Sequence, residues 1–124
     1  MLARPILLRT PALKRNPLKL NPLQLRTLTL LQEMAKYPEL STRNQDSGEV
    51  FLSNIPQPHG DHFHVGRRVV LAKDATGLNN QAVWVALERK GLVKATFPFA
   101  ITLTVAGLSY DTGLGDVILH GSDH

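Results

Sequence analysis

Two short strings contain all five histidines of the chain, and imidazole is a common metal ligand and proton carrier near neutral pH. The first runs from His59 to His64 (HGDHFH), and the second (HGSDH) covers residues 120–124. Residues i and i+2 of a strand share a face, so His62 and His64 would point the same way. Asp61 or His59 could add a third ligand. The first string therefore predicts a divalent-metal site, with zinc or another transition metal as the cofactor.

Two other interpretations fit the same residues. The histidines could cap turns and hydrogen-bond the backbone of a polar hairpin, or they could bind protons or another ligand. The position of the second string separates these interpretations. The metal interpretation is favoured if His120 or His124 lies within coordination reach of His62 and His64, and disfavoured if the second string points to solvent.

The sequence contains no convincing catalytic constellation, so we expect a binding protein rather than an enzyme. The chain has no cysteine, which excludes disulfides, thiolate metal sites and cysteine nucleophiles. Gly113 and Gly115 lack the third glycine and the strand-to-helix setting of a dinucleotide-binding loop. Ser109 and Ser122 lie outside any nucleophile elbow.

Length and composition indicate one globular domain. The 124 residues can bury a single core, and 43% of them are hydrophobic, which is typical of folded proteins. The longest apolar runs fall far short of the ~18 residues that a membrane span needs, so no membrane partner is expected. The absence of cysteine favours a reducing, cytoplasmic location.

The positive charge is concentrated in the first twenty residues. This segment carries five of the fourteen basic residues and none of the ten acidic ones, which leaves the rest of the chain close to neutral. Its three prolines predict a mobile arm over 1–20, ahead of a domain over 21–124. The arm could be a solvated tail, a nucleic-acid-binding segment or an organellar targeting peptide.

A helix over 21–37 is the clearest local expectation. Asn21 suits the N-cap, Pro22 the first helical position, and Gln24 the third position of a capping box. The other expected elements, in chain order, are a polar loop at 39–48, a β-hairpin from strands at 49–55 and 62–65, an ambiguous segment at 69–72, a helix over about 79–90 capped by Asn79 or Asn80, strands flanking 97–99, and a short helix from Thr104.

Three strings in the second half of the chain carry a family resemblance: TGLNNQAV at 76–83, ALERKGLV at 86–93 and TVAG at 104–107. They resemble the recognition helix, wing and following helix of winged helix-turn-helix transcription regulators, notably the antibiotic-resistance-regulator and PadR-like families. The resemblance covers about residues 70–112. It implies an α+β, winged-helix-like single domain with an extra β-hairpin. It also implies a transcription regulator that binds double-stranded DNA as a homodimer, and a broadly apolar first helix would suit that dimer.

The resemblance places the DNA-contacting residues on the helix at 79–90. Val83 and Leu87 would face the core, which leaves another side of the helix for the duplex. Asn and Gln can read adenine edges, and Arg and Lys can contact phosphates. The predicted DNA-contacting residues are Asn80, Gln81, Trp84, Arg89 and Lys90.

The expected wing departs from the family pattern. The segment at 95–100 (ATFPFA) contains no basic residue, although wings of this family usually carry Arg or Lys into the minor groove. Phe97 and Phe99 in this segment would suit a protein contact. Two alternatives therefore stand beside DNA binding: a small protein-interaction domain without DNA contact, and a histidine-cluster protein that binds a divalent metal.

Overall fold

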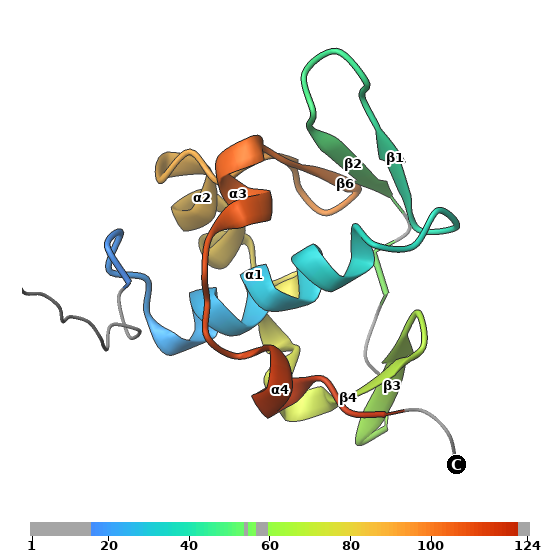
Figure 1. The fold of residues 1–124 in the computed structure, drawn as a ribbon. Helices are drawn as coiled ribbons and strands as arrows, with labels where there is room; N and C mark the ends of the chain where they lie inside the picture. The colour runs from blue at the N-terminus through green and yellow to red at the C-terminus, as the bar shows by residue number, and fades with distance from the viewer. Residues whose placement is uncertain (1–15, 54, 57–59, 122–124) are drawn as a thin grey trace, which may run out of the picture.

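A computed structural model describes residues 16–53, 55–56 and 60–121. Over these residues the chain is a small mixed α+β domain with four α-helices and two antiparallel sheets (Figure 1). The elements in chain order are α1 (Pro22–Met34), β1 (Ser41–Arg43), β2 (Val50–Ser53), β3 (His62–Val65), β4 (Arg68–Leu71), the 3₁₀ turns η2 (Ala72–Asp74) and η3 (Thr76–Asn79), α2 (Gln81–Arg89), β5 (Val93–Thr96), β6 (Ala100–Leu103), α3 (Val105–Ser109) and α4 (Gly115–Ile118).

The first helix begins as the sequence predicts. Asn21 Oδ1 accepts a hydrogen bond from the Gln24 amide at 2.8 Å, and Gln24 Oε1 accepts one from the Asn21 amide at 3.0 Å, which completes the capping box. The helix ends at Met34 rather than at residue 37. Pro38 disfavours the helical conformation for the residue before it, so the last expected turn does not form.

The pairing of the strands corrects the expected hairpin. The strand at 49–55 does not pair with the strand at 62–65, because β2 lies between β1 and β6 in a sheet of order β1-β2-β6-β5. β1 forms inside the predicted polar loop at 39–48. An edge strand with exposed side chains lacks the apolar alternation that sequence patterns detect.

The second sheet is a separate hairpin of β3 and β4. The ambiguous segment at 69–72 contributes its first three residues to β4, and two 3₁₀ turns follow in place of a helix. η3 packs directly on α1, since a Cβ atom added at Gly77 would lie 1.9 Å from Thr27 Oγ1. The segment ahead of α2 is therefore held against the core without a full helix.

α1 runs through the centre of the domain (Figure 1). The four-stranded sheet and α2 lie on one side of it, and the β3–β4 hairpin and α4 lie on the other. Its side chains Leu28, Leu30 and Leu31 are fully buried in the core, and Leu23 and Leu25 pack against it partly buried. Complete burial of such a side chain contributes about 1.5–3 kcal/mol. No helix over the described residues has the length and apolar character that a membrane crossing requires.

The domain begins earlier than the predicted boundary at residue 21. Leu20 is buried, and the Asn16 side chain bonds both the amide and the carbonyl of Leu20. The Leu18 amide donates to Tyr110 Oη at 3.1 Å. Residues 16–20 of the expected mobile arm are thus fixed against the domain, while residues 1–15 lie outside the described residues.

Candidate nucleic-acid interface

α2 carries the candidate DNA-contacting residues, and its start and end follow from local chemistry. Asn80 Oδ1 accepts a hydrogen bond from the Ala82 amide at 3.0 Å, which confirms Asn80 as the N-cap. The chain turns at Gly91, whose φ of 78° favours glycine. The Leu92 amide then donates to the Leu87 carbonyl at 3.1 Å, and Leu92 returns to the core. The Asn80 side chain is consequently engaged in capping.

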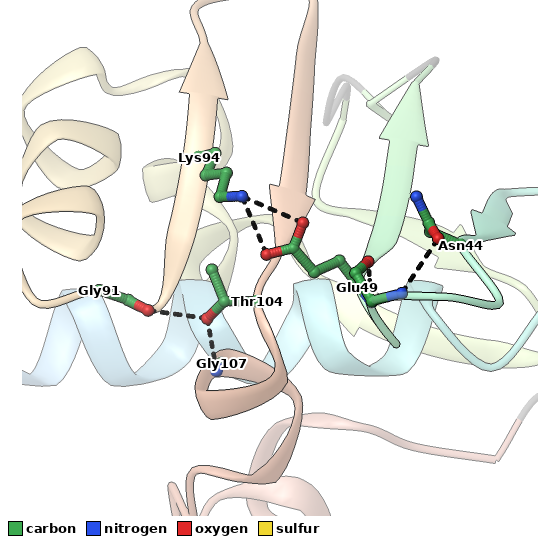
Figure 2. A network of polar contacts seen from close by, with 7 residues as sticks. Asn44, Glu49, Gly91, Lys94, Thr104 and Gly107 are labelled. Atoms are coloured by element: carbon green, nitrogen blue, oxygen red, sulfur yellow. Dashed lines mark hydrogen bonds and ion pairs between the residues drawn. The ribbon is translucent and has the colours of Figure 1, made fainter.

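A junction between Gly91, Thr104 and Gly107 joins α2, the β5–β6 hairpin and α3 (Figure 2). The Thr104 hydroxyl donates to the Gly91 carbonyl at 2.7 Å and accepts from the Gly107 amide at 3.0 Å. Thr104 is therefore the N-cap of α3, as predicted. A Cβ atom at Gly107 would lie 2.0 Å from the Leu92 carbonyl oxygen, so only glycine allows α3 to approach this closely. The junction explains the spacing of the strings at 86–93 and 104–107.

Trp84 does not lie on the outer side of α2. Only 1% of it is exposed, and its ring packs edge-on against Phe97 with 4.8 Å between the ring centroids. The expectation that Trp84 faces outward is wrong. The three large apolar residues Val83, Trp84 and Leu87 fall within about 100° of the helix circumference, and this geometry identifies the buried side of the helix.

The exposed face of α2 is formed by Gln81, Val85, Glu88 and Arg89, and Lys90 is exposed at its C-terminal end. Val85 lies on the outward side of the helix, where Trp84 was predicted to lie. The face carries the Gln81 amide near the helix N-terminus, and the Glu88 carboxylate and two basic groups near the C-terminus. Among the described residues, no ion pair involves Arg89 or Lys90. These two groups can therefore approach a polyanion without breaking an existing pair.

The hairpin that follows α2 has little positive charge of its own. Lys94 Nζ lies 3.0 Å from Glu49 Oε2, so the basic residue of β5 is paired with a carboxylate at the start of β2 (Figure 2). Phe97 is packed on Trp84, whereas Phe99 at the turn is 73% exposed. The hairpin presents an aromatic side chain rather than a cation at its tip.

The candidate metal ligands lie on the β3–β4 hairpin, away from α2. His62 and His64 share the exposed face of β3 as predicted, with 5.9 Å between their ring centroids, while Phe63 is buried on the other face. His62 Nδ1 lies 3.1 Å from Asp61 Oδ1, and this hydrogen bond lowers the pKa of the Asp61 carboxyl. His59 lies outside the described residues.

The second histidine string reaches this hairpin from its far edge. The amide and carbonyl of His120 bond those of Val69 at 3.0 Å each, and Arg68 donates to the carbonyls of Leu119 and His120. Val69 also pairs with His64, so the backbones of His64 and His120 are separated by two strand spacings, or about 10 Å between Cα atoms. Over the described part of the chain, no three His, Cys, Asp or Glu side chains are placed to hold a metal ion. His124 lies outside that part.

Comparisons with protein-family models, curated proteins and solved structures returned no match for this chain.

Proposed function

We propose that this domain is a winged helix that binds double-stranded DNA, with α2 as the recognition helix and the β5–β6 hairpin as the wing. The observation that carries the proposal is the junction of Gly91, Thr104 and Gly107, which joins helix, hairpin and following helix into one unit. The sheet order supports it as well. The second strand of the wing, β6, lies between the first strand, β5, and a strand from the first half of the chain, β2.

The dimensions of α2 suit the major groove. An α-helix with its side chains is about 10–12 Å in diameter and the major groove is about 12 Å wide, so the nine-residue α2 can lie in the groove. Gln81 near the N-terminus can form paired hydrogen bonds with adenine. Arg89 and Lys90 near the C-terminus can contact phosphates. Val85 between them can pack on a thymine methyl group.

The charge of this surface predicts modest, salt-dependent affinity. At the exposed end of α2, Arg89 and Lys90 form no ion pair with any described residue, and Lys94 is paired with Glu49. Two phosphate contacts would give a slope of log affinity against log salt of about −2. Further contacts by the basic residues of the N-terminal segment would make the slope steeper.

A salt titration of duplex binding tests the proposal. Fluorescence anisotropy of a labelled random duplex should show binding that weakens as salt rises. The double variant Arg89→Gln/Lys90→Gln should reduce the slope by about 2. The matched control Arg43→Gln/Arg67→Gln removes the same charge from β1 and from the β3–β4 turn, and it should leave the slope unchanged. Equal losses in both double variants would show non-specific attraction and would contradict the proposal.

A protein-interaction domain is the second candidate, and Phe99 favours it. An aromatic side chain that is 73% exposed at the tip of a hairpin is a common anchor in protein interfaces. The basic residue of the same hairpin, Lys94, is already paired with Glu49. If this candidate holds, the wild-type chain shows no salt-dependent binding to duplex, and Phe99→Ser abolishes binding to a protein partner.

The expected homodimer stays a prediction, but the surface that could form its interface differs from the one expected from the sequence. α1 cannot supply the apolar interface, since its apolar stripe is buried in the core. The exposed Val105 of α3 and Val117 of α4 remain available on the described surface. Sedimentation of the wild type against Val105→Ser/Val117→Ser would show whether a dimer forms there.

A further inference from the structure

A pocket separates α1 from the chain that follows α3. It has a volume of about 700 Å³ and is lined by one face of α1, by Arg43 of β1 and by residues between Leu108 and Leu119. In Figure 1 the orange-to-red chain from α3 to α4 passes across α1, and this chain forms one wall of the pocket. The volume lies within the range that small-molecule sites occupy.

The floor of the pocket is a polar face of α1. Thr29, Gln32 and Glu33 follow the spacing i, i+3 and i+4, which places them on one side of the helix, and Lys36 follows in the turn after it. Gln32 Nε2 donates to the carbonyls of Gly107 and Tyr110 at 2.9 and 2.8 Å, and Thr29 Oγ1 lies 2.6 Å from Thr112 Oγ1. Floor and wall are thus hydrogen-bonded to each other, so the pocket is already formed without a ligand.

Glu33 has one carboxylate oxygen in this floor that forms an ion pair but accepts no hydrogen bond from the described residues. The residue is only 3% exposed, and Tyr37 Oη donates to its Oε2 at 2.8 Å. Lys36 Nζ lies 3.0 Å from Oε1 but in a geometry that makes no hydrogen bond, and Oε1 accepts none from any other described residue. A buried carboxylate oxygen whose ion pair supplies no well-directed hydrogen bond is incompletely satisfied, so a better-placed donor would be bound favourably.

Lys36 is a weak competitor for this position. Its side chain is 67% exposed, and an exposed lysine gains little from an ion pair because water screens the charge. The side chain can turn into solvent at low cost when another cation arrives. Asp111 and Asp116 on the wall add two carboxylates, against the single further cation Arg43. The lining therefore favours a positively charged ligand.

We propose that this pocket binds small alkylammonium cations, with Glu33 Oε1 as the primary acceptor. The ligand's ammonium group replaces Lys36 at Oε1 and donates the hydrogen bond that the lysine does not make. Its carbon chain packs against the apolar part of the lining, which includes Leu108 and Leu119. A second ammonium group meets Asp111 or Asp116. This site is separate from the exposed face of α2 and does not depend on DNA binding.

Calorimetry on the full chain at fixed ionic strength tests the proposal with three probes of similar length. We expect 1,4-diaminobutane to bind, whereas 1,4-butanediol and succinate do not. Glu33→Gln should weaken diamine binding by at least about tenfold, as the loss of a charged hydrogen bond implies. Glu88→Gln, which removes an exposed carboxylate from α2, is the matched control and should not change binding.

Lys36→Gln should change the affinity for the diamine in the direction opposite to Glu33→Gln. Removal of the competing ammonium should tighten diamine binding by several-fold, and a purely structural role for Lys36 would not do this. Unchanged or weaker binding by Lys36→Gln would overturn the proposal, as would diamine binding that Glu33→Gln leaves intact or equal binding of the diol. If Glu33→Gln fails to fold, the Lys36→Gln result decides alone.

Discussion

The two hairpins that follow β2 have similar lengths but are built into the domain in different ways. The β5–β6 hairpin belongs to the four-stranded sheet, and the Thr104 hydroxyl connects its base to α2 and α3. The β3–β4 hairpin is a sheet of its own, joined at its outer edge to His120 by backbone bonds. Its histidines share a face, yet they do not converge with a third ligand among the described residues. Close packing between elements therefore identified a structural unit in this domain, whereas the clustering of histidines in the sequence did not identify a metal site among the described residues.

The first prediction tests whether α2 is anchored through its aromatic side chain. Trp84→Ala should lower the free energy of unfolding by about 3–5 kcal/mol, because it leaves a large cavity beside Phe97. Phe99→Ala in the same hairpin should change it by less than about 0.5 kcal/mol, since that side chain is exposed. Urea denaturation measures both. Similar losses in the two variants would mean that Trp84 and Phe99 are comparably buried.

The second prediction concerns the close approach of α3 to Leu92. Gly107→Ala should destabilise the domain by about 2–3 kcal/mol, since the new methyl group meets a backbone carbonyl that cannot move aside easily. In an open helical position the same change is neutral or stabilising. Gly115→Ala supplies that control, because nothing lies within 4 Å of its added Cβ. A stable Gly107→Ala protein would disprove the tight junction.

The third prediction isolates the hydroxyl of Thr104. Thr104→Val keeps the shape of the side chain but removes both the N-cap of α3 and the bond to Gly91, so we expect a loss of about 1 kcal/mol. Thr42→Val on the exposed edge strand β1 is the control and should be neutral within about 0.5 kcal/mol. Thermal unfolding followed by circular dichroism is sufficient. An unaltered unfolding midpoint for Thr104→Val would show that the hydroxyl contributes no measurable stability.

The smallest effect is expected at the β3–β4 hairpin. Two imidazoles on one strand face bind zinc weakly, and zinc at a concentration equal to its dissociation constant stabilises a protein by about 0.4 kcal/mol. We expect a shift of this size for the wild type and none for His62→Ala/His64→Ala. A stoichiometric zinc complex with a stabilisation of several kcal/mol would instead show that the β3–β4 hairpin carries a complete metal site.

The sequence predicted those elements that short-range chemistry determines. The capping box of Asn21 and Gln24 placed the start of α1, and Gly91 and Thr104 marked the ends of the α2 and β6 segments. These residues act on neighbours within a few positions, so a single sequence contains the necessary information.

The missing parts depend on long-range pairing. The strand β1 forms because Thr42 and its neighbours find β2 as a partner, and nothing in their own polarity requires it. The pairing of β2 with β6 joins residues about fifty positions apart, which the local pattern at 49–55 could not indicate. The pocket over Glu33 was missed for the same reason, since its wall comes from the chain beyond α3. Trp84 was misplaced because only Val83 and Leu87 were assigned to the core, although Trp84 lies next to them on the same side of the helix.

Nuclear magnetic resonance mapping of a duplex titration tests the central claim most directly. The claim is that the exposed face of α2 is the nucleic-acid surface and that the β3–β4 hairpin is not. In nitrogen-labelled protein at moderate salt, we predict that duplex shifts the amide signals of Gln81, Val85 and Arg89 and those of the β5–β6 turn. The signals of His62 and His64 should stay in place. Shifts confined to the β3–β4 hairpin, or no shifts at saturating duplex, would contradict the claim.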